Sequence, residues 1–185
     1  MKHRVCPVWV GYLLACPVRT IVHNPRRILG PFVKPGMTVL DVGSAMGFFS
    51  LPMARLVGAG GREICVDLQA RMLERLTKRA QRAGLAERVE TRLCDAAGLR
   101  VDDLASRVDF ALAFAVVHEV PAAVRLMREI VGALKPDGRL LIAEPRGHVS
   151  ASAFEETILT AATVGLRTVS TPRIARCHAT LLERT

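Results

Sequence analysis

The chain has few aromatic residues and no long uninterrupted apolar run. Phe, Trp and Tyr make up only 4% of its 185 residues, so few rings are available to stack on nucleic-acid bases. No uncharged apolar segment approaches the roughly 18 residues that a membrane-spanning helix needs. The five cysteines form no CxxC pair and no zinc-like spacing. We therefore expect neither a membrane span nor a bound metal, and the scattered cysteines suit a reducing compartment.

Acidic residues are scarce relative to basic ones. The chain has 17 Asp and Glu against 26 Lys and Arg, which gives a net charge of +9. Such an excess suggests a nucleic-acid partner, but the basic residues are spread along the whole chain. Their densest group recurs at helical spacing, which favours a solvated helix face: Arg71, Arg75, Lys78, Arg79 and Arg82. The charge alone therefore does not predict a nucleic-acid binder.

The N-terminal residues resemble an export signal only superficially. A basic start is followed by an apolar stretch up to Cys16, but Pro7 interrupts this stretch. We predict that residues 1–34 form a helical segment, packed against the protein or covering its site as a lid. Residues 35–185 are predicted to form one domain, of a size that buries its own core. We expect a cytoplasmic protein.

From residue 36 onward, strand-like and helix-like segments alternate. Short β-branched or apolar runs at 38–42, 63–67, 89–93, 108–117 and 139–143 are each followed by a loop and, in most cases, by a helical pattern. This alternation predicts an α/β fold with a doubly wound, mostly parallel seven-stranded sheet. The last two strands, at 166–170 and 175–182, have no helix between them and should form an antiparallel edge pair.

Ligands of such sheets bind beyond the carboxyl ends of the strands. The first strand ends in Asp41-Val-Gly43-Ser44-Ala45-Met-Gly47, where small residues stand at offsets 0, 2 and 4 from Gly43. A dinucleotide fingerprint needs them at 0, 2 and 5, and here Phe48 occupies offset 5. Asp41 would also repel a pyrophosphate. A nicotinamide dehydrogenase is therefore disfavoured.

Acidic residues follow the next two strands as well. Asp67 comes after the second strand, where a carboxylate can accept hydrogen bonds from both ribose hydroxyls. Asp95-Ala96 comes after the third strand, where the carboxylate can accept from an exocyclic amine and the next N–H can donate to a ring nitrogen. Three acids at successive strand ends predict a site for an adenosine whose tail is amino-acid-like rather than phosphate.

This pattern resembles the class I S-adenosylmethionine-dependent methyltransferases of the small-molecule type, over Gly36–Leu182. The family's first motif matches Val39 to Gly47, except that Ala45 stands where glycine is usual. Its ribose-binding and adenine-reading acids match Asp67 and Asp95. The resemblance implies a Rossmann-like fold, S-adenosylmethionine as cofactor and no required metal. It also implies contacts to the cofactor from Asp41, Gly43, Ser44, Ala45, Gly47, Asp67, Leu68, Asp95, Ala96 and the backbone near Phe114.

The segment after the fourth strand, Val116-Val-His118-Glu119, should border the methyl group in this architecture. His118 is a candidate general base, because its ordinary pKa lies near 6.5, and Glu119 could do the same or orient His118. Alternatively, His118 merely packs beside the cofactor and Glu119 caps the next helix. Glu144 and His148 are weaker candidates for lining an acceptor pocket.

The acceptor is expected to be a small molecule. The chain lacks the Asn/Asp-Pro-Pro-aromatic motif of base-amine methyltransferases and the Pro-Cys nucleophile of those that attack pyrimidine carbon. Metalloid methylation would need thiolates near the methyl group, for which Cys6, Cys16 and Cys177 are the candidates. The alternative is an inactive or RNA-directed basic protein on a methyltransferase-like scaffold.

Overall fold

A computed structural model describes residues 19–95 and 97–185 of the chain. These residues divide into two compact units, one ending at Ala97 and the other running from Gly98 to Thr185. Three predictions lie outside the described residues: the fold of segment 1–18, any thiol site that uses Cys6 and Cys16, and the contact of Ala96 with adenine.

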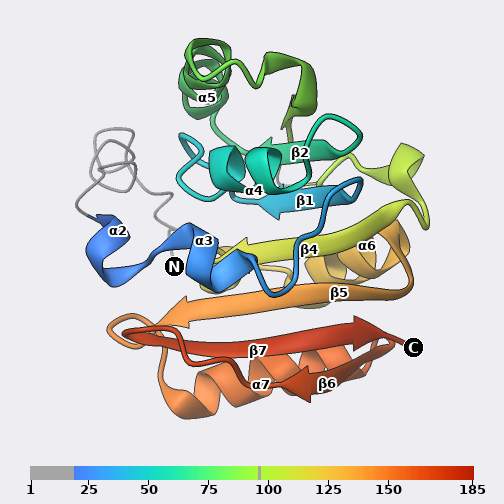
Figure 1. The fold of residues 1–185 in the computed structure, drawn as a ribbon. Coiled ribbons are helices and arrows are strands. Elements are labelled where there is room, and N and C mark those ends of the chain that lie inside the picture. Colours follow the sequence, from blue (N-terminus) through green and yellow to red (C-terminus); the bar gives the residue numbers. More distant parts are fainter. Residues whose placement is uncertain (1–18, 96) are drawn as a thin grey trace. The chain divides into compact units, whose positions relative to one another are not determined.

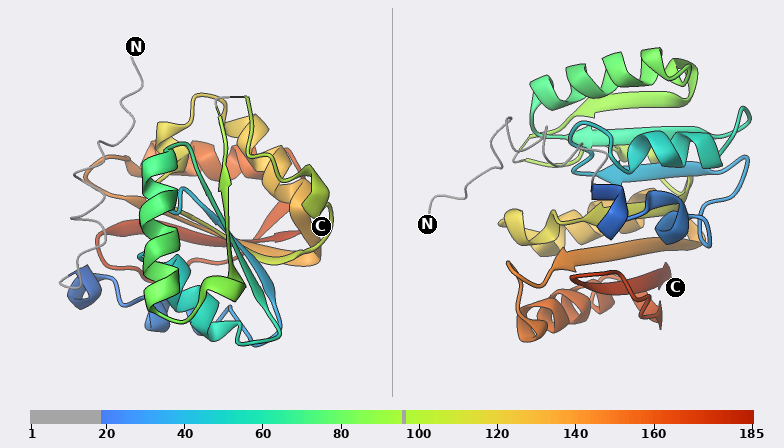
Figure 2. Two further views of the ribbon diagram at one scale, coloured as in Figure 1. Left: turned by 90° about the horizontal axis from the view of Figure 1, so that it is seen from above. Right: turned by 60° about the vertical axis from the view of Figure 1, so that its left-hand side comes forward.

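The first unit contains three parallel strands with two helices packed on them (Figure 1). The strands are β1 (Thr38–Val42), β2 (Arg62–Asp67) and β3 (Val89–Leu93), and β2 lies between the other two. The helices are α4 (Ser50–Leu56) and α5 (Ala70–Arg82). Figure 2 shows α5 running alongside β3. Nearly every residue of β1 and β2 is buried, as their continuous apolar runs predict.

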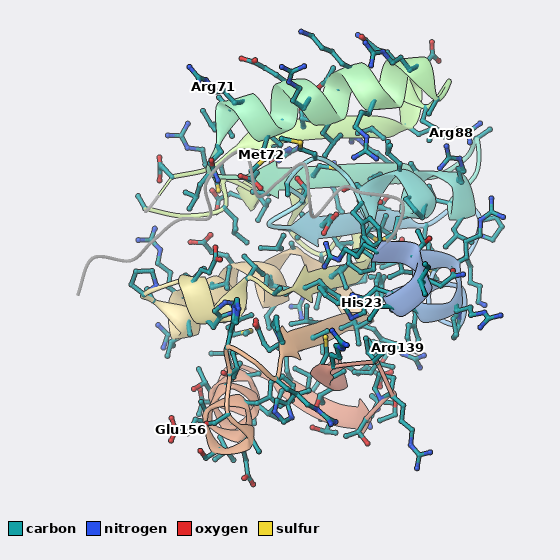
Figure 3. The ribbon with its side chains drawn as sticks, turned by 90° about the vertical axis from the view of Figure 1, so that its left-hand side faces the viewer. His23, Arg71, Met72, Arg88, Arg139 and Glu156 are labelled. Carbon is teal, nitrogen blue, oxygen red and sulfur yellow. The ribbon has the colours of Figure 1, made fainter. Side chains whose placement is uncertain are left out.

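Helix α5 shows how the sequence pattern sorts its side chains. Its buried residues recur every three or four positions and pack on β2 and β3: Met72, Leu73, Leu76 and Ala80. In Figure 3, Met72 points toward the strands and Arg71 points away. The predicted solvated face is confirmed for four of its five basic residues, which are exposed: Arg71, Arg75, Lys78 and Arg82. The fifth, Arg79, is half-buried.

The second unit contains four strands and two helices. The strands are β4 (Val108–Phe114), β5 (Leu134–Pro145), β6 (Leu166–Ser170) and β7 (Cys177–Arg184). Strand β4 pairs with β5 in parallel, whereas β7 pairs with both β5 and β6 in antiparallel orientation. Helix α6 (Ala123–Ala133) packs on β5 and on α7 (Ala151–Ala162). Figure 1 shows α7 lying along β6 and β7.

The predicted fold class is confirmed. The strands form a seven-stranded sheet in the order β3-β2-β1-β4-β5-β7-β6. Only the pairs that involve β7 are antiparallel among the strand pairs recorded for the described residues. The antiparallel edge pair is the one predicted from the missing helix between the last two strands.

Strand β4 ends earlier than its apolar run predicts. The run continues to Val117, but the strand stops at Phe114 because Ala115 has a φ of +56°. This left-handed conformation turns the chain out of the strand, and Val117–Glu119 form a short 3-10 helix, η3. Hydrophobicity alone cannot reveal such a turn, since alanine is not a typical left-handed residue. Because β4 ends early, His118 lies in η3 rather than directly after the last residue of the strand.

Residues 19–34 contain two short helices, α2 (Arg19–Val22) and α3 (Pro25–Leu29). The guanidinium of Arg19 lies 4.6 Å from the ring centroid of Phe48, which follows the glycine-bearing loop. The domain boundary at residue 34 and the function of this segment as a lid stay predictions. Among the described helices, none is both long and apolar enough to cross a membrane.

Gly47 is required by packing as well as by its φ of +81°. A Cβ at this position would lie 3.0 Å from Leu76 Cγ and 3.5 Å from Leu51 Cγ. We predict that Gly47→Ala lowers the free energy of unfolding by about 2–3 kcal/mol, from left-handed strain together with overpacking. Urea unfolding measures the loss.

Gly58→Ala is the matched control. Gly58 has a similar φ of +67°, but no atom lies within 4 Å of the position that an alanine Cβ would occupy there, so only the backbone strain remains, about 1 kcal/mol. Equal losses in the two variants would show that contact with Leu76 and Leu51 is not what requires glycine at position 47.

Candidate active site

Three residues of the loop after β1, which comprises residues 43–47, adopt left-handed backbone conformations. Gly43, Ala45 and Gly47 have φ values of +74°, +47° and +81°. The N–H groups of Gly43 and Ser44 donate to the carbonyl of Val66, at 2.9 and 3.1 Å. Left-handed backbone costs a residue with a Cβ about 1–2 kcal/mol, so Ala45 keeps this conformation only because its surroundings enforce it.

Asp67 supplies that constraint from the end of β2. Its Oδ2 accepts the N–H of Ala45 and its Oδ1 accepts the N–H of Gln69, both at 2.8 Å. Burial raises the pKa of Asp67, and these backbone hydrogen bonds oppose the rise. A carboxylate offers about four lone-pair sites, so acceptor capacity remains for an external hydroxyl. Asp67 therefore holds the loop and is still able to bind a ligand.

Arg79 holds the same loop from α5. Its guanidinium donates to the carbonyl of Met46, and burial lowers its pKa. The helical pattern placed Arg79 among the solvated basic residues, which is wrong for this one position. The sequence carries no signal for the contact, because Arg79 has the same spacing as its exposed neighbours.

Asp41 is buried behind the loop. Asp41 is only 3% exposed, and its Oδ2 accepts a hydrogen bond from Ser50 Oγ at 2.6 Å. Burial, assisted by the charge of Asp67 and opposed by the Ser50 hydroxyl, raises its pKa to about 7. Glu63 on β2 is fully buried as well, and burial with the charge of Asp41 raises its pKa. This pair of carboxyls was not expected from the sequence.

Three other residues that the sequence assigns to the cofactor site differ in their exposure. Leu68, next to Asp67, is 47% exposed although it is a large apolar side chain. Ser44 Oγ is buried and has no hydrogen-bond partner among the described residues. Asp95 is exposed, and its Oδ1 accepts the N–H of Ala97 at 2.7 Å. The structure thus brings Asp41, Asp67 and the loop together, with Asp95 on the chain that follows the neighbouring strand β3.

In the second unit, His118 is paired with a buried acid. Its Nδ1 lies 2.5 Å from Oε2 of Glu144, whose other oxygen accepts the N–H of Val117 at 2.8 Å. Glu144 is 1% exposed, whereas the His118 side chain is 22% exposed. The hydrogen bond to Glu144 raises the pKa of His118, partly opposed by burial. His118 and Glu144 therefore form a dyad, in which a buried carboxylate orients a partly accessible imidazole.

The acid that orients His118 is Glu144, which the sequence ranked behind Glu119. Glu119 contributes only through its charge to the raised pKa of His118. The ring of His148 lies 5.6 Å from that of His118, at 74°, so the two weaker candidates both reach His118. Phe114, 8% exposed, ends β4 directly before the left-handed Ala115. Within the described ranges, no group of three or more His, Cys, Asp and Glu side chains could hold a metal ion.

Comparison with known families gives the geometry its context. Residues 33–172 match the model of a methyltransferase domain. The chain belongs to this methyltransferase family. Its membership confirms the predicted likeness to the class I enzymes and their cofactor, S-adenosylmethionine.

Individual relatives agree with this assignment. The chain is 32% identical over 127 residues to the ubiquinone/menaquinone biosynthesis C-methyltransferase UbiE of Cellvibrio japonicus, covering 66% of this chain and 50% of that one. It is 32% identical over 121 residues to the arsenite methyltransferase of Halobacterium salinarum, covering 65% and 30%. The chain thus spans half or less of the length of these two relatives. Its fold matches a SAM-dependent methyltransferase from Aquifex aeolicus with a TM-score of 0.88, at 23% identity over 98% of this chain and 100% of that one.

The residues of the first unit fit S-adenosylmethionine. The unpartnered Ser44 hydroxyl and the loop backbone suit an amino-acid tail, the spare acceptor capacity of Asp67 suits ribose hydroxyls, and exposed Leu68 suits an adenine face. Asp67, and Asp41 once it ionises above a pH of about 7, give the site a negative character that matches a cationic sulfonium. Ala45 does not disturb this fit, because it adopts the left-handed turn that glycine would.

The raised pKa of Asp41 predicts a pH-dependent stability. Between its ordinary value of 3.8 and about 7, native Asp41 keeps a proton that the unfolded chain has lost. Stability therefore falls as pH rises through this window, by about 4 kcal/mol at 1.4 kcal/mol per pH unit. We expect Asp41→Asn, which cannot ionise, to be more stable relative to wild type at pH 8 than at pH 5, as followed by urea unfolding at both values.

Glu74→Gln, at an exposed position of α5 in the same unit, is the control for loss of a negative charge. The prediction fails if the stability difference between Asp41→Asn and wild type is the same at both pH values.

A second prediction concerns the imidazole of His118. Because the Glu144 hydrogen bond is the largest cause of its raised pKa, Glu144→Gln should lower that pKa to its ordinary value near 6.5 or below it. NMR titration of the His118 ring Cε1 proton measures the shift. Glu119→Gln should change it less, and the reverse order of the two effects would contradict the dyad.

Proposed function

We propose that this chain transfers a methyl group from S-adenosylmethionine to a small-molecule acceptor. The observation that carries the proposal is the loop 43–47, held by Asp67 in a strained conformation, while Ser44 Oγ has no hydrogen-bond partner among the described residues and Leu68 is 47% exposed. Strain that the surroundings maintain is typical of a binding site. Unsatisfied groups beside it are what a bound nucleoside with a polar tail would satisfy.

S-adenosylmethionine supplies a methyl group on a sulfonium, which is already activated for displacement. The work of the protein is therefore to hold the acceptor in line and to exclude competing reactions. Asp67 and the loop bind and orient the nucleoside. Arg79 keeps the loop in place from α5, and Asp41 holds Ser50 at the start of α4. No metal is needed for this role.

His118 is proposed as the general base for an acceptor that must lose a proton. Nδ1 faces Glu144, so Nε2 is the nitrogen that faces away from the buried acid and is available to take a proton. The resulting imidazolium is stabilised by the Glu144 carboxylate, which in turn is fixed by the N–H of Val117. Glu144 is thus a positioning residue, and it acts only through His118.

A small acceptor is favoured by the segment after β4. Ala115-Val-Val-His118-Glu119 contains neither of the motifs with which this class modifies nucleic-acid bases. The relatives are divided, because some are named for small molecules and others for protein substrates, such as protein L-isoaspartate and ribosomal protein L11. One curated relative is named for ubiquinone and menaquinone biosynthesis and another for arsenite, and both names denote small acceptors. The proposed acceptor is of that size class.

One observation favours a second candidate function, an RNA-binding protein on this scaffold. The exposed cations of α5, Arg71, Arg75, Lys78 and Arg82, form a single face of one helix. Such a face can follow a phosphate backbone, and binding through it would weaken steeply with salt. This candidate predicts RNA binding without cofactor affinity.

Calorimetry with S-adenosylhomocysteine tests the proposed function. We expect binding to the wild-type chain, and a loss of about tenfold or more in Asp67→Ala, because hydrogen bonds to a charged acceptor contribute about 1.5–3 kcal/mol. Asp67 also holds the loop, so the 2′-deoxy analogue of the ligand is measured with both proteins. If Asp67 contacts the ribose, removing the hydroxyl weakens binding to wild type but has little further effect in Asp67→Ala.

Asp102→Ala, an exposed acid of the second unit, controls for the change of charge and should leave the affinity unchanged. Labelled S-adenosylmethionine is then supplied with a protein-free metabolite extract, where methyl transfer to a small product is expected. Wild-type protein that binds RNA but not S-adenosylhomocysteine would replace the proposal with the second candidate.

A further inference from the structure

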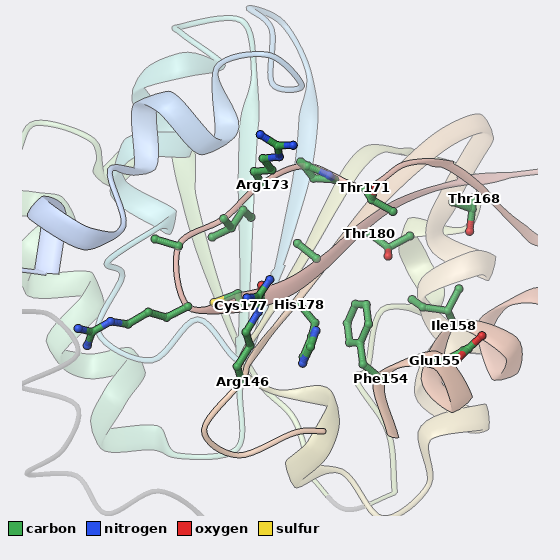
Figure 4. Close-up of a pocket in the computed structure, with 15 residues that line it drawn as sticks. Arg146, Phe154, Glu155, Ile158, Thr168, Thr171, Arg173, Cys177, His178 and Thr180 are labelled. Carbon is green, nitrogen blue, oxygen red and sulfur yellow. The ribbon is translucent and has the colours of Figure 1, made fainter. Parts of the chain in front are cut away.

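The second unit contains a cavity of about 760 Å³ that no step above uses (Figure 4). It is bordered by the start of β7, the connection 171–176 between β6 and β7, one face of α7, and Arg146 after β5. A volume of this size is within the range of small-molecule binding sites. All of its lining belongs to residues 146–180, so it is complete within this unit.

The cavity has an excess of positive charge. Arg146, Arg173 and Arg176 line it, whereas Glu155 is the one acidic residue in the lining. None of the three guanidinium groups has an ion pair within the described residues, in contrast to Arg139 and Arg167, which both pair with Glu183. Arginines without acidic partners in one concave site are suited to bind an anionic ligand group.

Two of these arginines are held in place by the backbone. The N–H of Arg146 donates to the carbonyl of Arg176 at 2.9 Å, and its Nε donates to the carbonyl of Cys177 at 3.2 Å. Arg176 has a φ of +58°, a left-handed conformation that costs a non-glycine residue about 1–2 kcal/mol. Strain of this kind is kept where the surroundings fix it, and it is frequent at ligand sites.

Another part of the lining is aromatic and apolar. The rings of Phe154 and His178 stack with centroids 5.5 Å apart at 25°, and Ile158 follows Phe154 by one turn of α7. Figure 4 shows the two rings side by side, with Arg146 on the same side of the close-up and Arg173 farther along the connection. The lining therefore combines cationic groups with a surface against which a planar ring can pack.

The cavity is joined to the His118–Glu144 dyad through the β5–β7 pairing. Glu144 and His178 are direct cross-strand partners, and such partners project from the same face of a sheet. One partner thus orients the proposed base, while the other lines the cavity. Arg146 and His148, two residues apart, likewise contact the cavity and the His118 ring respectively.

We propose that this cavity binds the methyl acceptor, a small planar molecule with an anionic group, through the guanidinium of Arg146 and the stacked Phe154–His178 pair. The inference rests on the proposed function for its acceptor role, but the anion site itself depends only on the second unit. Carboxylate and phosphate both match the arginines, and the experiment separates them.

Calorimetry on the 185-residue chain uses benzoate, phenyl phosphate and the neutral analogue benzamide as probes. We expect benzoate or phenyl phosphate to bind at least tenfold more tightly than benzamide, and the tighter of the two identifies the anion. Arg146→Gln should weaken binding of that probe about tenfold, and Arg146→Lys should restore part of it, because Lys retains the charge but not the bidentate geometry.

Arg128→Gln removes the same charge from an exposed position of α6 outside the lining, and should change the probe affinity less than twofold. The inference is overturned if benzamide binds wild type as tightly as the anions, a comparison that needs no variant to fold. It is also overturned if Arg128→Gln weakens binding as much as Arg146→Gln.

The same samples are titrated with S-adenosylhomocysteine, which Arg146→Gln should bind with wild-type affinity. If S-adenosylhomocysteine binding is retained but the anions are not preferred, the proposed anion site in the cavity is refuted and the proposed function is not. Anion selectivity without S-adenosylhomocysteine binding would refute the acceptor role together with the proposed function, and would leave an anion site.

Discussion

The hydrogen bond between the Ala45 N–H and the Asp67 carboxylate is the constraint on which the first unit depends. It joins the loop after β1 to the end of β2, and it holds an alanine in backbone that alanine otherwise avoids. Val66 and Arg79 strengthen the same connection from the strand and from α5. One carboxylate thus serves two purposes, because the oxygens that order the loop also carry the lone pairs left for a ligand. A loop ordered before binding loses less conformational entropy when the ligand arrives.

The electrostatic character of this unit comes at a cost in stability. Asp41, Glu63 and Asp67 are all buried, and burial raises the pKa of each. Removing such carboxyls from water disfavours their charged forms, and their mutual repulsion adds to the effect. A cationic ligand opposes both contributions, since its charge favours ionised carboxylates nearby. Proteins commonly accept strain and buried charge where they bind ligands, and recover stability from apolar packing elsewhere. Here that packing is in strands β1 and β2, in which nearly every residue is buried.

Much of this arrangement could be predicted from the sequence, for a physical reason. Parallel strands end at one edge of a sheet, so acids that directly follow successive strands, such as Asp41 and Asp67, must come close together. The contacts that were missed depend on register and side-chain direction instead. Glu144 reaches His118 because β4 ends early at the left-handed Ala115, and Arg79 reaches Met46 because it stands at the edge of the buried face of α5. Neither of these two contacts can be deduced from local patterns of hydrophobicity. Arg146 likewise joins the cavity only through the antiparallel pairing of β5 with β7.

The position of strand β7 in the chain has a consequence for the cavity. The part of the chain shared with the methyltransferase-domain model ends at residue 172, before β7, although the fold match to the Aquifex aeolicus methyltransferase covers 98% of the chain. The loop on Asp67 lies well inside the shared part. Substitutions at His178 or in the connection after residue 172 would therefore change the lining of the cavity while leaving this loop as it is.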